Sequence, residues 1–174
     1  MISPDEAAIQ AEQNFLEGYN CAQSVLLVFA SELNLEKSTA LRMAQSFGGG
    51  TCRLREMCGT VSGMLMALGC AEGSDDPRDK NAKDRLYKIG QSLVKRFSDL
   101  HGSFICKELL GLVPVGTSKS FLAREVVSNS GSVVSEERTA EYYKKRPCPK
   151  LCADSARIFA EYLNEVYLRS NGHN

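Results

Sequence analysis

The chain has 174 residues, and its 21 lysines and arginines balance its 21 aspartates and glutamates. A chain of this length buries a sizeable core in one domain without disulfides, and the charge balance excludes the basic excess of a general nucleic-acid binder. We therefore expect no nucleic-acid partner. The apolar runs are too short for a membrane span, and the N-terminus lacks a signal-peptide pattern, so a cytoplasmic protein is expected.

Helical spacing of apolar residues dominates the sequence. The first such stretch, 3–18, opens with Ser3 as N-cap and Pro4 in the first turn. The others are 20–33, 38–47, 56–71, 77–102, 102–111 and 148–172, and weaker helical patterns occur at 118–127 and 135–146. No stretch alternates at period two for long enough to indicate a sheet. The sequence predicts one all-α domain over 1–174, a bundle of about six to eight helices.

Seven cysteines are scattered along the chain. An odd number in a chain that needs no disulfide framework favours free thiols, a metal site or a transient catalytic disulfide. Free cysteine also packs as a small hydrophobe, and we expect this role for Cys70, at the end of an apolar run. For Cys152, one turn into the last helix, core packing and a functional role are equally expected.

Four of the cysteines share a position at the start of a predicted helix: Cys21, Cys58, Cys106 and Cys148. A helix N-terminus carries partial positive charge and unpaired N–H groups, which stabilise a thiolate and lower the pKa of the thiol. Around Cys148, the stretch KKRPCPK adds four cations that act in the same direction if they point toward the sulfur. We therefore expect reactive or ligating thiolates at these positions.

Two glycines, Gly59 and Gly63, follow Cys58 one helical turn apart. Each destabilises a helix by roughly 1 kcal/mol relative to alanine, so another interaction must offset the penalty. One interpretation is tight packing against a second helix. The other is that the missing side chains let a bound group reach the Cys58 sulfur, which would make Gly59 and Gly63 cofactor-binding residues.

The spacing of the cysteines excludes several familiar sites. The chain has no Cys-x-x-Cys of the thioredoxin or zinc-ribbon type, and no Cys-x-x-Cys-His for covalent haem attachment. A Cys–His nucleophile pair would have to use His101. The stretch FGGGTCRLR, with Arg53 and Arg55, resembles an anion-binding loop but lacks the lysine and hydroxyl residue of a P-loop.

The cysteines and their neighbours, taken in order, resemble one known family. From about residue 14 to 165 the chain is similar to the C_GCAxxG_C_C family, whose members are described as redox-active. The resemblance rests on GYNCAQSV at Cys21, FGGG followed by CGTVSG at Cys58, ICKELLG at Cys106 and CPKLCADSARIF at Cys148.

The resemblance implies that these four cysteines, with Gly59 and Gly63, are the family's characteristic residues. Thr60 departs from the motif's alanine, although both residues are small. Cys52, Cys70 and Cys152 lie outside the pattern, and the region 112–140 is expected to be a local insertion. Similar sequence in the N-terminal region of split-Soret-type cytochromes favours, by analogy, electron transfer or an iron–sulfur site.

Three functions remain open at this point. In the first, a thiol-dependent oxidoreductase, two of the four cysteines cycle between dithiol and disulfide, with a redox protein or small molecule as partner. In the second, zinc or an iron–sulfur cluster is bound by four thiolates, those of Cys21, Cys58, Cys106 and Cys148. In the third, the chain is a non-catalytic helical scaffold whose small residues let helices pack, including in a homodimer.

Overall fold

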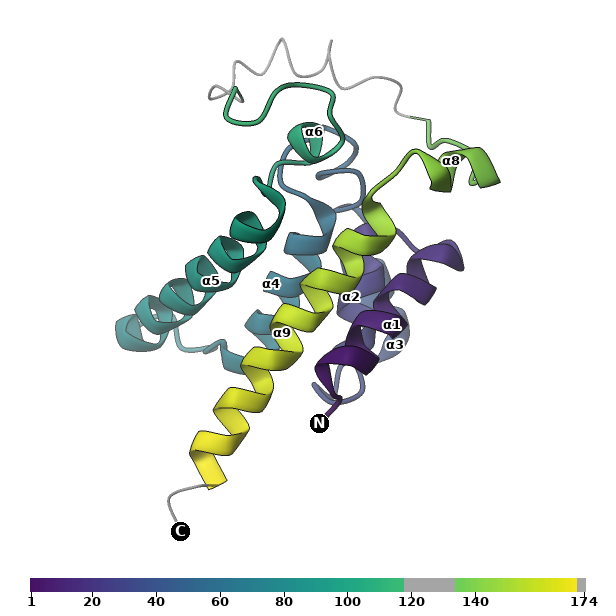
Figure 1. Cartoon of the computed structure of the whole chain (residues 1–174). Helices are drawn as coiled ribbons and strands as arrows, with labels where there is room; N and C mark the ends of the chain where they lie inside the picture. Colours follow the sequence, from purple (N-terminus) through teal and green to yellow (C-terminus); the bar gives the residue numbers. More distant parts are fainter. Residues whose placement is uncertain (118–133, 172–174) are drawn as a thin grey trace.

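A computed structural model describes residues 1–117 and 134–171, and in these ranges the chain folds into helices with no sheet (Figure 1). The all-α prediction is confirmed. The described helices are α1 (Pro4–Leu16), α2 (Cys21–Phe29), α3 (Lys37–Gln45), α4 (Gly59–Glu72), α5 (Lys80–His101), α6 (Cys106–Leu109), α8 (Ala140–Lys144) and α9 (Cys148–Asn171). The expected helix 118–127 and much of the expected insertion 112–140 lie outside the described residues.

Side-chain caps fix where the helices begin. Ser3 and Glu6 form a capping box at α1, and Asn20 with Gln23 forms another at α2. The Asn20 side chain also donates a hydrogen bond to the carbonyl of Gln45, 2.9 Å away, at the end of α3. One asparagine therefore sets the start of α2 and ties it to α3, directly before Cys21.

Helix α2 is the centre of the bundle. Residues on all its sides are buried, and it packs against α1, α3, α4 and α9. Its Phe29 meets Phe159 of α9 edge to face, with ring centroids 4.8 Å apart. Helix α9 runs diagonally alongside α1, and α4 and α5 lie on its other side (Figure 1). This arrangement brings the starts of α2, α4 and α9 to the same end of the bundle.

The helix expected over 135–146 is shorter in the structure. Residues 134–139 are not helical, and Thr139 caps α8 by accepting a hydrogen bond from the backbone N–H of Tyr142. Arg138 explains the shortening, because its guanidinium donates to the carbonyls of Phe15 and Tyr19 at 2.7 and 2.9 Å. The segment before α8 is thus held across the end of α1.

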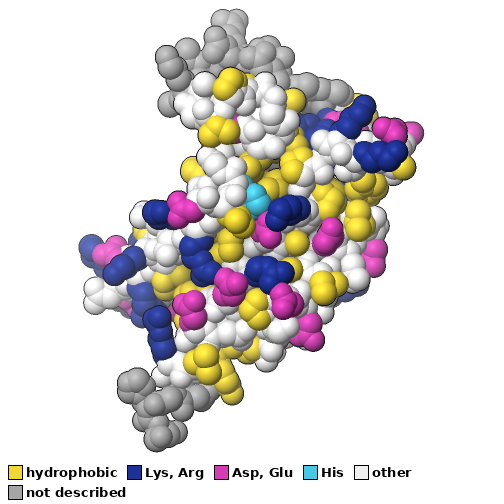
Figure 2. All heavy atoms as spheres, in the orientation of Figure 1, with side chains coloured by type: hydrophobic (Ala, Val, Ile, Leu, Met, Phe, Trp, Pro, Cys, Tyr) yellow, Lys and Arg dark blue, Asp and Glu magenta, His cyan; other side chains and the backbone are white. Residues whose placement is uncertain are grey.

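The expectation of core packing for Cys70 is wrong, because its side chain is exposed. Helix α4 buries Ala67 and Leu68 and turns Gly69 and Cys70 toward solvent. Figure 2 shows charges of both signs mixed over one face of the molecule, in keeping with the balanced composition. In the part of the chain that the structure describes, no helix has the length and apolar character needed to cross a membrane.

The two glycines of α4 lie against α2. A Cβ on Gly63 would stand 2.5 Å from the Ala22 carbonyl oxygen, and one on Gly59 would stand 2.8 Å from the Phe47 carbonyl oxygen and 3.0 Å from Cys21 Cβ. Real Cβ atoms do not approach backbone oxygens so closely. The helix-packing interpretation of this glycine pair therefore accounts for both positions, and it places Cys21 beside the start of α4.

We predict that Gly63→Ala destabilises the fold by about 1–3 kcal/mol, because the new methyl group forces α2 and α4 apart. Gly69→Ala is the matched control on the same helix, since a Cβ there meets no atom within 4 Å. The control should be neutral or stabilising by up to about 1 kcal/mol. Urea unfolding followed by circular dichroism measures both changes, and equal stability of the two variants would contradict the packing argument.

Candidate functional site

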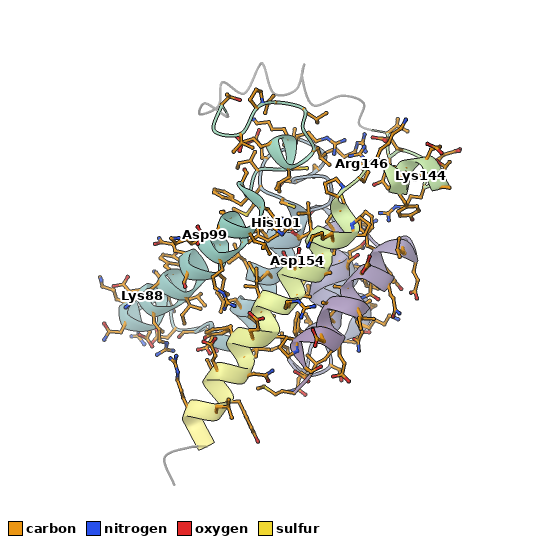
Figure 3. All side chains as sticks on the ribbon, viewed as in Figure 1. Lys88, Asp99, His101, Lys144, Arg146 and Asp154 are labelled. Atoms are coloured by element: carbon orange, nitrogen blue, oxygen red, sulfur yellow. The ribbon has the colours of Figure 1, made fainter. Side chains whose placement is uncertain are left out.

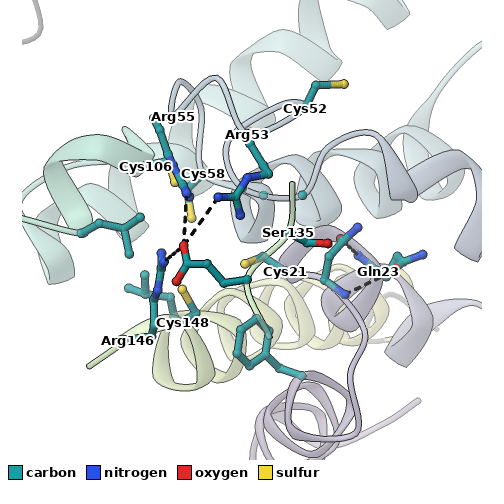
Figure 4. Close-up of a pocket in the computed structure, with 18 of the residues that line it drawn as sticks. Cys21, Gln23, Cys52, Arg53, Arg55, Cys58, Cys106, Ser135, Arg146 and Cys148 are labelled. Carbon is teal, nitrogen blue, oxygen red and sulfur yellow. Dashed lines mark hydrogen bonds and ion pairs between the residues drawn. The ribbon is translucent and has the colours of Figure 1, made fainter. Parts of the chain in front are cut away.

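All four helix-start cysteines line one cavity of about 750 Å³ (Figure 4). Cys58 is the N-cap of α4, and the other three are the first residues of α2, α6 and α9. Cys52 also borders this cavity. In Figure 4 the sulfurs of Cys21, Cys58, Cys106 and Cys148 face a common space, whereas that of Cys52 points away from it. Residues spread over most of the chain are thus gathered at one end of the bundle.

A short backbone pairing holds Cys58 beside Cys106. Met57 and Ile105 form an isolated antiparallel bridge. Cys58 N–H donates to the Phe104 carbonyl at 2.9 Å, and Cys106 N–H donates to the Glu56 carbonyl at 2.6 Å. Because both backbones are fixed at this point, the two side chains start from adjacent positions on the cavity wall.

The loop before α4 runs through a left-handed turn. Gly49, Gly50 and residues 51–53 all have positive φ, as does Arg55. Left-handed conformations cost L-residues about 1–2 kcal/mol each and persist only where the surroundings enforce them. Gly50 is needed for a second reason, since a Cβ there would lie 2.6 Å from Cys106 Cβ. The strained turn places Arg53 and Arg55 in the cavity lining.

Three of the thiols lie close enough to influence one another's ionisation. The Cys21 thiol is coupled to those of Cys148 and Cys152, and each of these two shifts the pKa of Cys21. Cys152 Sγ additionally lies 3.9 Å from the Cys21 carbonyl oxygen. All seven cysteines are free thiols in this structure. The sequence left the role of Cys152 open; its spacing of one helical turn from Cys148 is the signal that places both on one face of α9.

The pKa values of Cys21 and Cys148 are both raised. The hydrogen bond from Cys148 lowers the pKa of Cys21, but the contact with Cys152, burial and nearby sulfurs raise it more, to well above its ordinary value. The hydrogen bond to Cys21, burial and the charge that Cys21 would carry raise the pKa of Cys148. Ionising one of these thiols therefore makes ionising the next one harder.

The pKa values of the other two cavity thiols, Cys58 and Cys106, are raised as well. Burial and then the neighbouring Cys106 raise the pKa of Cys58 to about 12, although the Thr60 hydroxyl, 3.3 Å from Cys58 Sγ, opposes the shift. Burial raises the pKa of Cys106, against the charge and hydrogen bond of Arg55. The expectation of lowered pKa values at these helix starts is wrong for the reduced protein, because burial and mutual repulsion outweigh the helix ends.

Arginine side chains supply most of the charge around the cavity. Its described lining includes Arg53, Arg55, Arg138 and Arg146, but only one acidic residue, Glu136. The carboxylate oxygen Oε1 of Glu136 lies 2.5 Å from Arg146, 3.5 Å from Arg53 and 3.9 Å from Arg55. Figure 4 shows these three arginines converging on it. The sequence points to Arg53 and Arg55 as residues of an anion-binding loop but not to Glu136, which is remote in the chain.

Of the remaining candidate residues, Gly59 lines the cavity, whereas His101 and Gly63 do not. His101 Nε2 is 3.2 Å from Asp154 Oδ2, between α5 and α9 and away from Arg146 (Figure 3). It is not among the described residues around the cysteines, so no Cys–His pair forms there. Gly59 is part of the cavity lining, whereas Gly63 packs against α2 one turn further along.

As placed, the side chains do not fit a single metal ion. Within residues 1–117 and 134–171, no three or more cysteine, histidine, aspartate or glutamate side chains gather in an arrangement that could hold one. The four cysteines share a cavity without forming a closed ligand set. A group of neighbouring thiols in one cavity is the chemical feature that this arrangement presents.

We predict that alkylation of Cys58 in reduced, chelator-treated protein still accelerates between about pH 9 and 11, because its thiolate fraction rises steadily below a raised pKa. Thr60→Ala should slow the reaction about 2- to 10-fold by removing one hydrogen bond to the thiolate. Thr60→Ser keeps the hydroxyl and is the control. Peptide mass mapping of iodoacetamide-treated samples measures the rates, and a plateau below pH 9 would contradict the assignment.

Comparison with known proteins agrees with the cysteine arrangement. The model of the family described as "Putative redox-active protein (C_GCAxxG_C_C)" matches residues 19–162. The matched span begins just before Cys21 and ends beyond Cys148, so it contains the whole cysteine set. No match was found among curated proteins or among solved structures. Because the matched span covers most of its length, the chain belongs to the C_GCAxxG_C_C family.

Proposed function

We propose that the chain is a thiol-dependent oxidoreductase in which Cys21 and Cys148 cycle between a dithiol and a disulfide. The observation that carries this proposal is that both thiols line one cavity, where each shifts the pKa of the other. The two residues come from helices at opposite ends of the sequence, yet the fold brings their side chains together. Neighbouring sulfurs on one cavity wall need only a local movement to reach disulfide geometry.

The exchange reaction balances with a disulfide substrate. One thiol loses its proton to solvent and attacks a substrate sulfur, which breaks the substrate S–S bond and releases one thiolate. The second protein thiol, also deprotonated, attacks the mixed disulfide and releases the second thiolate. Two electrons pass from the protein to the substrate, and the two protons lost by the protein equal those taken up by the released thiolates.

The cavity surroundings match the demands of this reaction. Raised pKa values keep the resting thiols protonated, so ionisation is the costly step. Arg146 and Arg55 lower that cost for Cys148, and Arg55 does so for Cys106. A reducing compartment such as the cytoplasm would return the disulfide to the dithiol form.

We predict that mild oxidation of the reduced protein forms an intramolecular disulfide between Cys21 and Cys148, because these thiols are coupled neighbours in one cavity. Mass spectrometry of non-reduced peptides identifies the linked pair. Cys21→Ser and Cys148→Ser should abolish that link, whereas Cys70→Ser, an exposed cysteine outside the cavity, should leave it unchanged. Oxidation that links no cavity cysteines in the wild-type protein would refute the proposal.

A metal or iron–sulfur centre is the second candidate, since all four family cysteines line one cavity. Elemental analysis of anaerobically purified protein separates the two functions. Less than stoichiometric metal, together with titratable cavity thiols, supports the dithiol. Stoichiometric zinc, or iron with visible colour, supports the centre instead. A non-catalytic scaffold predicts neither disulfide formation nor metal.

A further inference from the structure

One charge pattern at the cysteine cavity goes beyond what dithiol chemistry needs. Arg53, Arg55 and Arg146 all point at one carboxylate oxygen of Glu136. A guanidinium group recognises a carboxylate by donating parallel N–H bonds, and one arginine suffices for one carboxylate. Among the described residues of the cavity lining, four arginines accompany a single carboxylate, so this part of the wall carries net positive charge.

The arginines are held firmly, while Glu136 is not. The side chains of Arg55 and Arg146 are only 10% and 17% exposed, against 47% for Glu136. Arg146 also lies over the Tyr142 ring, 5.0 Å from its centroid. The backbone next to Glu136 is anchored through Arg138 to the end of α1. The Glu136 side chain can therefore rotate into solvent while the backbone and the arginines stay in place.

The arginine site and the thiols belong to the same cavity. Arg55 and Arg146 line the cavity together with Cys106 and Cys148, and Arg146 lies two residues before Cys148 on the chain. The cavity volume of about 750 Å³ is in the range of small-molecule sites. An anion bound by the three arginines would thus lie in the same small chamber as the proposed dithiol.

We propose that Arg53, Arg55 and Arg146 form a carboxylate-binding site for a small acidic disulfide, and that Glu136 occupies this site in the free protein. A substrate carboxylate displaces the Glu136 side chain and brings the substrate S–S bond to the cavity thiols. The reaction step rests on the proposed dithiol function, whereas the binding step rests on the arginines alone. Binding and oxidation must therefore be measured separately.

The binding test uses suberate, a dicarboxylate with no sulfur, in calorimetric titrations of the reduced protein. Arg146→Gln and Arg53→Gln should each weaken suberate binding about 10- to 100-fold, because each removes a charge-assisted donor. Glu136→Gln should tighten it about tenfold, because the competing carboxylate is gone. Glu137→Gln, an identical charge change on the exposed neighbouring residue, should stay within about twofold of wild type.

The reaction test compares dithiodipropionate, which has the chain length of suberate, with neutral hydroxyethyl disulfide. Each rate of protein oxidation is divided by the rate of free cysteine with the same disulfide, which removes intrinsic reactivity. The wild-type protein should prefer the acidic disulfide about tenfold or more, and Arg146→Gln should lose that preference. Octanediol, a neutral analogue of suberate, should not bind.

The outcomes distinguish the two proposals. Suberate binding with the expected order of variants but no disulfide formation upholds the arginine site and refutes the dithiol. Disulfide formation without suberate binding, or equal effects of Glu136→Gln and Glu137→Gln, overturns the arginine site and leaves the dithiol standing. If circular dichroism shows that Arg146→Gln is unfolded, Arg53→Gln, on a different element, decides the same question.

Discussion

The close contact between α2 and α4 is the constraint on which the rest of the site depends. Gly59 and Gly63 allow it, since a side chain at either position would collide with backbone atoms of the neighbouring segment. The contact puts Cys21, at the start of α2, next to Cys58, at the start of α4. Helix α9 then packs against both helices and adds Cys148 and Cys152 from one face. The glycine pair therefore acts on the chemistry through packing.

Electrostatics in the cavity combine two opposing effects. Buried thiols close to one another resist ionisation, which favours the protonated, reduced form. The arginines around them favour negative charge, whether on a sulfur, on Glu136 or on a bound anion. This arrangement requires the strained left-handed turn at 49–53, because that turn carries Arg53 and leads into Arg55. Strain of this kind is commonly stored where function requires it.

The helical fold and the position of the four family cysteines at helix starts could be predicted from the sequence, because caps, apolar periodicity and motif order are local signals. The pKa direction could not. A helix start favours a thiolate, but the outcome at Cys58 and Cys148 is set by burial and by sulfurs from distant segments. The exposure of Cys70 could not be predicted for a related reason, since an apolar run does not reveal which side of a helix faces the core.

By itself, the sequence determined that the chain is helical, that four cysteines lie at or near helix starts, and that two small residues follow one of them. Only the tertiary structure decided which cysteines are neighbours, that Cys152 joins Cys21 and Cys148, and that Glu136 meets three arginines. The physical reason is the separation along the chain over which each interaction acts. Capping and periodicity act over a few residues, whereas thiol contacts, desolvation and ion pairs depend on how segments far apart in the chain are packed together.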